Sequence, residues 1–406
     1  MARPPKTPRR RVLFIGEGAT LAHAARPLAL AAALPKDRYE VVLALPERYR
    51  AWVPAHVAWR PLKTQDPALF VHRLTEARPL FSTRTLRDYF AWDMKLIEEV
   101  RPDAIVGDLR LSLAASAREA KTPYLAVSNA YWSDQRPLRI ERPALTALRW
   151  MPPPMAELAF RVLQPGAVKG HVKPLARLLA SRGLDIPLDV RRIVTEADVT
   201  LWADIPALFP EVAETARARF VGPLSWEPPM PPPPWWDTVP ADRPIAYLTL
   251  GGSGPAKLLA PLAGWLVEAG YTVLAATAGQ GALETDGERL FVADYLPGAA
   301  AAARAALVVC NGGAPTATQA LVAGRPVLGV CANVDHFLNM RAVQAAGAGL
   351  VLRAERLGRR RFQAALARLR APVFARAAEA LQADARGLDP AATLDRAIQD
   401  LLAVRP

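Results

Sequence analysis

The stretch that decides the fold is Val308-Val309-Cys310-Asn311-Gly312-Gly313-Ala314-Pro315-Thr316-Ala317-Thr318-Gln319-Ala320-Leu321. It begins with an apolar run, Ala306 to Cys310, that has the length of a buried parallel strand. Gly312-Gly313 then permits a sharp turn, and Pro315 suits the first position of a helix. Gly324 and Pro326 predict where this helix ends. The pattern therefore predicts the strand, glycine turn and helix of a βαβ unit.

The start of this predicted helix favours an anion. The residue before the helix is expected to be Ala314, which is a poor cap. We therefore expect the amides of Thr316 and Ala317 to stay free at the positive end of the helix dipole. A phosphate group fits such a site.

Together with the residues that follow it, the stretch resembles the donor-binding signature of UDP-sugar-dependent glycosyltransferases with the GT-B fold. That signature reads roughly His-x-Gly-x-Gly-Thr-x-x-Glu-Ala-Leu-x-x-Gly-x-Pro, then Asp-Gln-x-x-Asn. Four residues depart from it, namely Asn311, Pro315, Gln319 and His336. An ordinary βαβ unit with a glycine turn is the alternative, and the downstream Asp-His-x-x-Asn argues against it. The matching residues are Gly313, Thr316, Ala320, Leu321, Gly324, Pro326, Asp335 and Asn339.

The resemblance implies an α/β protein with the GT-B fold, in which two Rossmann-like domains face a central cleft. The run of prolines from Pro231 to Pro234 is stiff and extended, which is typical of a linker between domains. We expect an acceptor-binding domain over 1–222, a Pro-rich linker over 223–244, a nucleotide-sugar-binding domain over 245–385, and a C-terminal helix over 386–406 that packs back on the first domain.

The first half of the chain opens like a Rossmann unit. Val12 to Gly16 predicts a buried strand, and a helix follows from about Leu21 to Leu34. His23 therefore falls at the carboxyl end of the strand, where open α/β sheets bind ligands. The family has its catalytic His here, in a pattern like Gly-His-Val-x-Pro, and Arg26 takes the usual proline position. The alternative is a structural role, which a lone His beside an apolar helix has more often than a catalytic one.

An acidic partner for His23 ends a later strand. Arg101 to Asp108 predicts a turn and a strand, and the family has a similar Pro-Asp-x-x-Val-x-Asp whose last Asp supports the catalytic His. The resemblance thus implies that Asp108 orients the imidazole and stabilises its protonated form. The alternative is that Asp108 caps a helix from Leu111 to Lys121.

The resemblance also implies which residues hold the donor. Gly252 and Ser253 stand where the family places a Gly-Ser near the diphosphate, and Tyr295 stands where relatives stack a Trp ring on uracil. We find no convincing paired-Asp motif of the metal-dependent transferases, so no metal or other cofactor is predicted and the UDP-sugar is a co-substrate. The predicted donor-binding residues are Gly252, Ser253, Tyr295, Asn311, Gly312, Gly313, Thr316, Gln319, Asp335 and His336.

The composition limits the kinds of molecule that the protein is expected to bind and the compartment in which it is expected to lie. The chain has 406 residues, enough for two domains, and a net charge of +13, which fits either solvated basic faces or attraction to anionic ligands or a membrane surface. It carries no nucleic-acid-binding signature and no signal for an oligomeric state. Two cysteines, Cys310 and Cys331, favour a reducing cytoplasm. We expect a cytoplasmic protein, with peripheral contact to the inner membrane as an option.

Residues 130 to 182 mix aromatic and methionine residues with many basic ones. Pro152-Pro153-Pro154 is expected to break this stretch into two helical pieces. The stretch suits a hydrophobic acceptor or one presented at a membrane, and a helical pair packed on the first domain is the alternative. The predicted function is an inverting, metal-independent UDP-sugar glycosyltransferase. A non-catalytic nucleotide-sugar-binding partner protein and a GT-B-fold epimerase are the alternatives.

Overall fold

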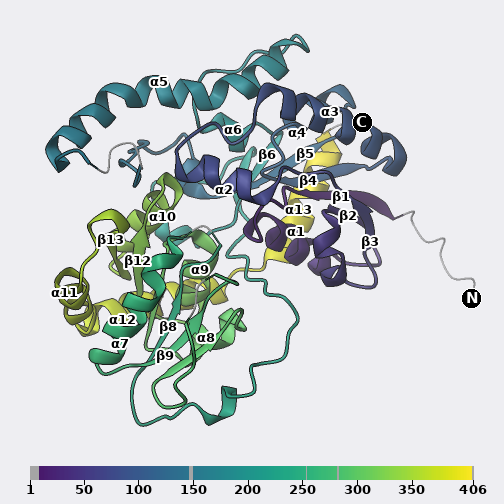
Figure 1. Ribbon diagram of the computed structural model, residues 1–406. Coiled ribbons are helices and arrows are strands. Elements are labelled where there is room, and N and C mark those ends of the chain that lie inside the picture. Colours follow the sequence, from purple (N-terminus) through teal and green to yellow (C-terminus); the bar gives the residue numbers. More distant parts are fainter. Residues whose placement is uncertain (1–8, 146–149, 253, 281–282, 405–406) are drawn as a thin grey trace, which may run out of the picture.

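The computed structural model contains two parallel β-sheets, one in each half of the chain (Figure 1). It describes residues 9–145, 150–252, 254–280 and 283–404. The first sheet has the strand order β3-β2-β1-β4-β5-β6-β7, and the second has the order β10-β9-β8-β11-β12-β13. In each sheet the order reverses beside the first strand, which is the arrangement of doubly wound α/β folds. The predicted pair of Rossmann-like sheets is confirmed.

The first sheet is buried on both faces, which explains why its strands are nearly continuous apolar runs. Val12 and Phe14 of β1 pack on one side with α1 and α13, and Leu13 and Ile15 pack on the other with α3 and α4. Its strands are β1 (Arg10–Gly16), β2 (Tyr39–Leu45), β3 (Ala58–Pro61), β4 (Ala104–Asp108), β5 (Tyr124–Ser128), β6 (Val199–Trp202) and β7 (Ala218–Phe220).

One long helix, α5 (Pro153–Ala180), corrects the expectation of two helical pieces around the prolines. Pro153 and Pro154 lie in its first turn, where a missing N–H costs nothing, so they begin the helix instead of dividing it. In Figure 1, α5 runs along the top of the molecule. The other helical segments of this half are α1 (Ala22–Ala33), η1 (Glu47–Trp52), α2 (Pro67–Thr75), α3 (Thr83–Val100), α4 (Leu113–Glu119), η2 (Ala130–Trp132), α6 (Arg192–Thr195) and η4 (Pro206–Leu208).

The second sheet follows a mostly extended segment that contains one short turn, η5 (Trp236–Thr238). Its strands are β8 (Ile245–Thr249), β9 (Thr272–Ala276), β10 (Leu290–Ala293), β11 (Leu307–Cys310), β12 (Val327–Cys331) and β13 (Gly349–Arg353). The helices around it are η6 (Ala256–Leu258), α7 (Leu259–Glu268), α8 (Gly298–Arg304), α9 (Ala314–Val322), α10 (Val334–Ala345), η7 (Ala354–Arg356), α11 (Arg359–Leu369) and α12 (Pro372–Arg386).

The last helix, α13 (Pro390–Val404), leaves the second domain and lies against the first. Leu394 and Ile398 are fully buried in the same cluster as Phe14 and Leu28, and the Tyr39 hydroxyl donates a 2.6 Å hydrogen bond to Asp395. The end of the chain therefore completes the core around the first sheet. Within the described residues, no helix is both long enough and apolar enough to span a bilayer.

Candidate active site

A cavity of about 810 Å³ lies between the two domains and is lined by both. His23, Asp108 and Tyr131 line it from the first domain, and Asn311 and Thr316 line it from the second. Both sheets turn the carboxyl ends of their strands toward it, as ligand-binding α/β sheets do. Of the predicted donor-binding residues, those that line the cavity are Gly252, Tyr295, Asn311, Gly313, Thr316, Gln319, Asp335 and His336.

His23 and Asp108 meet in this cavity. His23 lies in the first turn of α1, and its Nδ1 is 2.8 Å from Oδ1 of Asp108, the last residue of β4. The register of the sheet explains the contact, because β1 and β4 pair in parallel and place Gly16 beside Asp108. Asp108 does not cap α4: that helix begins at Leu113, and the residue before it is Ser112. The alternative structural role for this carboxylate is therefore wrong.

Arg26 is a third member of this cluster, and sequence reasoning assigned it no role. Its guanidinium pairs with both carboxylate oxygens of Asp108 and with the side chain of Asn129. Burial alone would raise the pKa of the Asp108 carboxyl, but the charges of Arg26 and His23 outweigh burial and hold that pKa below its ordinary value. Asp108 is therefore ionised at neutral pH. The available signal was an arginine one helical turn after the histidine, in a position where the family has proline.

The glycine turn after β11 takes the shape that its sequence requires. Gly312 has a φ of +89°, which favours glycine, and a Cβ there would lie 2.7 Å from the Sγ of Cys331. The Asn311 side chain accepts a 2.9 Å hydrogen bond from the Gly313 amide. Asn339 donates to the Gly312 carbonyl at 2.9 Å, so this downstream asparagine braces the turn.

Helix α9 begins one residue earlier than predicted, at Ala314, and Gly313 precedes it without a side-chain cap. The expectation for Ala317 is wrong, because its amide donates to the Gly313 carbonyl at 3.2 Å. Within the described part of the chain, the amides of Ala314 and Thr316 have no hydrogen-bond partner. These two donors, rather than those of Thr316 and Ala317, are available at the positive end of the helix.

The start of α10 carries Asp335 and His336. Asn333 caps this helix by accepting from the His336 amide at 3.0 Å. Burial lowers the pKa of His336 to about 4, so its ring is neutral at physiological pH. The ring Nε2 lies 3.2 Å from the Asn333 side-chain nitrogen, and the buried Nδ1 has no partner among the described residues.

Three further predicted residues lie around the same cavity. Tyr295 is half-exposed, and the Gly252 carbonyl accepts from Gln280 at 3.3 Å. Gln319 lies directly against Gly298, where any side chain would meet its Oε1 at 2.6 Å. Ser253 lies outside the described residues.

Tyr131 joins the two domains inside the cavity, and sequence reasoning noted it only as one aromatic residue among several. Its hydroxyl donates a 2.8 Å hydrogen bond to Asp335. The neighbouring Ala130 amide and Asn129 side chain both donate to Asp204. Burial raises the pKa of Asp204 to about 6, against these hydrogen bonds and the charge of Arg26. A polar network thus extends from His23 toward the second domain.

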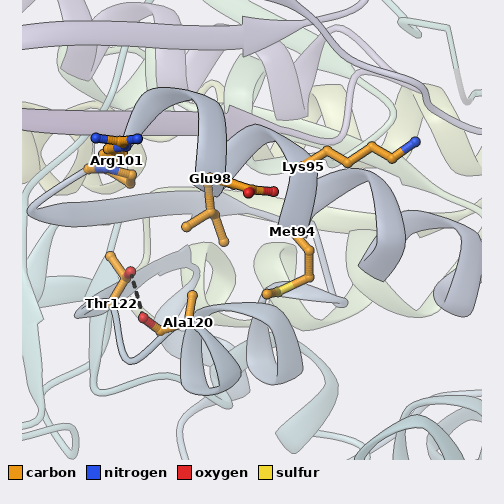
Figure 2. A pocket seen from close by; sticks show the side chains of 8 residues that line it. Met94, Lys95, Glu98, Arg101, Ala120 and Thr122 are labelled. Atoms are coloured by element: carbon orange, nitrogen blue, oxygen red, sulfur yellow. Dashed lines mark hydrogen bonds between the residues drawn. The ribbon is translucent and has the colours of Figure 1, made fainter.

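A smaller depression of about 500 Å³ lies between α3 and the end of α4 (Figure 2). The Thr122 hydroxyl at its edge donates to the Ala120 carbonyl at 3.4 Å. The depression shares no lining residue with the interdomain cavity and holds none of the predicted site residues. Separately, among the residues that the structure describes, no three His, Cys, Asp or Glu side chains gather to hold a metal ion.

Two facing Rossmann-like domains with such a cavity between them define the GT-B class, and comparison with known proteins agrees. Residues 276–394 match the family model of the erythromycin biosynthesis protein CIII-like C-terminal domain. The chain is 22% identical to the solved structure of the glycosyltransferase VinC in complex with DTDP, with a TM-score of 0.68, and the match covers 97% of this chain and 99% of that one. The predicted GT-B fold is confirmed.

Curated relatives are closer in sequence. The chain is 44% identical to a PGL/p-HBAD biosynthesis glycosyltransferase of Mycobacterium tuberculosis H37Ra, over 87% of this chain and 83% of the relative. It is also 44% identical to a PGL/p-HBAD biosynthesis rhamnosyltransferase of Mycobacterium bovis BCG, over 94% of this chain and 85% of that one. The chain therefore belongs to this family of GT-B glycosyltransferases, and the predicted enzyme class is confirmed.

Proposed function

We propose that the protein is an inverting, metal-independent glycosyltransferase that moves a sugar from a UDP-sugar to a hydroxyl group of a hydrophobic, lipid-like acceptor. One observation carries the proposal: His23 with Asp108 and the uncapped start of α9 line the same cavity from opposite domains. A base and an anion site that face each other across one cavity are what the transfer needs.

His23 serves as the base. The ionised Asp108 carboxylate can only accept a hydrogen bond, so Nδ1 of His23 carries the shared proton and Nε2 keeps its lone pair. Nε2 takes the proton of the acceptor hydroxyl as that oxygen attacks the sugar, and Asp108 stabilises the imidazolium that forms. His23 is partly exposed, with 22% of its side chain accessible, so an acceptor can reach it.

The start of α9 stabilises the leaving diphosphate. The amides of Ala314 and Thr316 and the Thr316 hydroxyl donate to its oxygens, and the helix dipole adds positive potential. The acceptor attacks from the face opposite to the diphosphate, because base and anion site lie on opposite walls. The anomeric centre is therefore inverted.

The remaining donor contacts follow from position and chemistry. Asp335 and His336 hold the sugar hydroxyls, Gln319 holds the ribose, and the ring of Tyr295 stacks on the base. A thymidine diphosphate carrier is the second candidate, because VinC was solved in complex with DTDP, and the two bases differ by a single methyl group. Rhamnose is a candidate sugar, since one relative is named a rhamnosyltransferase.

The acceptor approaches along α5, which borders the cavity and also faces solvent. Phe160, Gln164 and His171 line the cavity, whereas Leu158 and Val162 on another face of the helix are 66% and 71% exposed. Burying each such side chain in a membrane interface is worth roughly 1.5–3 kcal/mol. The helix is also basic: it contains one acidic residue, Glu157, and four exposed basic residues, Arg161, Lys169, Lys173 and Arg177. An anionic membrane surface complements this combination.

The test measures release of nucleoside diphosphate from UDP-glucose and from dTDP-rhamnose, with and without phenolic, macrolide and lipid acceptors. We expect acceptor-dependent release that EDTA does not inhibit, and a product whose anomeric configuration is opposite to that of the donor. Retention of configuration, or a requirement for a divalent cation, would overturn the proposed mechanism.

A further inference from the structure

The guanidinium of Arg26 is hydrogen-bonded to the Asp108 carboxylate, which is also bonded to His23. Its Nε donates to Asp108 Oδ2 at 2.6 Å, and its Nη2 donates to Asp108 Oδ1 at 2.8 Å. Two parallel hydrogen bonds from one guanidinium engage both oxygens of the carboxylate, and this bidentate contact fixes the plane of the Asp108 carboxylate. The pair is well shielded, because Asp108 has no exposed side-chain surface and Arg26 keeps only 13%.

Arg26 is anchored on its far side as well. Its Nη1 donates to the Asn129 side-chain oxygen at 2.8 Å, and Asn129 donates to the buried Asp204 at 2.9 Å. These partners lie at or just beyond the ends of β4, β5 and β6. Arg26 therefore ties the helix that carries His23 to three neighbouring strands, and the position of the imidazole depends on it.

Arg26 also places a positive charge beside the imidazole. Its Nη2 lies 3.2 Å from Nδ1 of His23, which already donates its proton to Asp108. A fixed cation at this distance opposes protonation of the ring, whereas the Asp108 carboxylate favours it. The ring therefore faces one negative and one positive neighbour, and a change at either alters the charge around it.

Other groups around His23 act less directly. Phe70 of α2 packs edge-on against the imidazole, with 6.5 Å between the ring centroids. Among the described residues, only His23 and Arg26 bond to the Asp108 carboxylate. Apart from the buried His336, the other charged side chains that line the cavity are Arg48, Arg78, His171, Glu227, Asp294 and Asp335.

We propose that Arg26 is a positioning residue for the transfer reaction: it fixes the Asp108 carboxylate that orients His23, and it holds a positive charge beside the imidazole. This inference rests on the proposed role of His23 as the base. It concerns a residue that touches neither donor nor acceptor in the proposed reaction.

Two substitutions separate the charge of Arg26 from its geometry. Arg26→Gln keeps a donor but removes the charge, and Arg26→Lys keeps the charge but loses the fork. For Arg26→Gln we expect the acid limb of the pH profile of kcat/KM to move up by about one pH unit. For Arg26→Lys we expect an unchanged acid limb and a kcat about tenfold lower. The KM for the donor should stay within about twofold in both, because Arg26 lies on the acceptor side.

A second readout does not depend on activity. In the full-length protein, the NMR titration of the His23 imidazole, assigned with His23→Ala, should shift in Arg26→Gln in the same direction as the acid limb. If His23→Ala retains transfer while this titration still shifts, the base assignment fails and the electrostatic effect of Arg26 stands. A wild-type pH profile and titration in Arg26→Gln would overturn the inference. Should that variant not fold, a wild-type kcat in Arg26→Lys would overturn it.

Discussion

The Tyr131 hydroxyl donates a 2.8 Å hydrogen bond to the Asp335 carboxylate, and the two residues belong to different domains. Tyr131 is fully buried, and burial, reinforced by the charges of Asp335 and Asp204, raises its pKa well above the ordinary value. The hydroxyl therefore keeps its proton and acts as the donor. One Asp335 oxygen is engaged across the domain boundary, and in the proposed reaction the other accepts from a sugar hydroxyl.

Removing this hydroxyl should weaken use of the donor. We expect Tyr131→Phe to lower kcat/KM for the nucleotide sugar by about 10- to 100-fold, because a hydrogen bond to a charged group is worth roughly 1.5–3 kcal/mol. The matched control is Tyr39→Phe, which loses a Tyr–Asp hydrogen bond of 2.6 Å to Asp395, away from the cavity. That control should lower the melting temperature and leave donor kinetics unchanged. Equal kinetic losses in both variants would argue against a role for Tyr131 at the donor site.

His23→Ala should remove turnover without removing nucleotide binding. General base catalysis contributes roughly 10²- to 10⁴-fold, so we expect transfer to fall by at least about 100-fold while the Kd for UDP stays within about twofold. Calorimetry and a transfer assay measure the two quantities. His56→Ala, an exposed histidine that does not line the cavity, is the control and should behave as wild type. Loss of UDP binding together with misfolding would refute the base assignment.

The glycine turn predicts a contrast between two Gly→Ala substitutions. Gly312→Ala places a Cβ 2.7 Å from Cys331 Sγ and 2.8 Å from Met340 Cγ at a positive φ. We expect it to lose about 2–4 kcal/mol of stability and to bind nucleotide at least about tenfold more weakly. Gly264→Ala on α7 meets no atom within 4 Å and should gain about 0.5–1 kcal/mol. Denaturant unfolding and UDP titration check both, and normal UDP binding by Gly312→Ala would contradict the turn's role.

The exposed face of α5 predicts membrane binding. We expect Leu158→Glu combined with Val162→Glu to reduce sedimentation with phosphatidylglycerol vesicles by about tenfold or more, because two exposed apolar side chains that enter the membrane interface become charged. Transfer to a short, water-soluble acceptor should not change. Val373→Glu introduces a charge at another exposed apolar residue, on α12, and should sediment as wild type does. If the wild-type protein does not sediment with anionic vesicles, this surface is not a membrane contact.

Glu17 predicts how stability changes with pH. Burial raises its pKa to about 7, even though Arg110 and Tyr89 favour the charged form. Between the unfolded value of about 4.5 and this value the folded state holds an extra proton, so wild-type stability falls by about 3 kcal/mol as pH rises through that window. Glu17→Gln lacks this titration.

The expected result is a stability difference, variant minus wild type, that becomes about 3 kcal/mol more favourable between pH 4.5 and pH 8. Denaturant unfolding at both pH values measures it. Glu99→Gln, an exposed partner of Arg60, provides the control and should show no such change. A difference that stays constant with pH would contradict the burial of a proton on Glu17.

Local patterns in the sequence sufficed for the glycine turn and for the strand and helix beside it, whereas the pair of sheets followed from the resemblance to GT-B glycosyltransferases. Gly312 and the run before it act within a few residues, so the strand, the turn and the helix follow from short-range rules. The exact start of α9 did not follow, because Ala314 can occupy either the cap or the first turn. A similar ambiguity explains why α5 was expected as two pieces: the prolines at its start suit a break and the beginning of a helix equally well.

The residues that sequence reasoning missed act over long separations. Arg26 meets Asp108 and Asn129 only because β4 and β5 end at the same edge of the sheet. Tyr131 meets Asp335 only when the two domains face each other. No periodicity in the chain encodes either contact, since the first depends on the order of the strands in the sheet and the second on how the two domains face each other.

The burial of Leu394 and Ile398 beside β1 has a consequence for how the polypeptide is made. The first domain leaves the ribosome before the second, yet one wall of its interior is supplied by α13, which follows the second domain in the chain. Synthesis at roughly 5–20 residues per second keeps that wall missing for tens of seconds. During this interval the newly made domain exposes an apolar groove of the kind that chaperones bind, until α13 has been made.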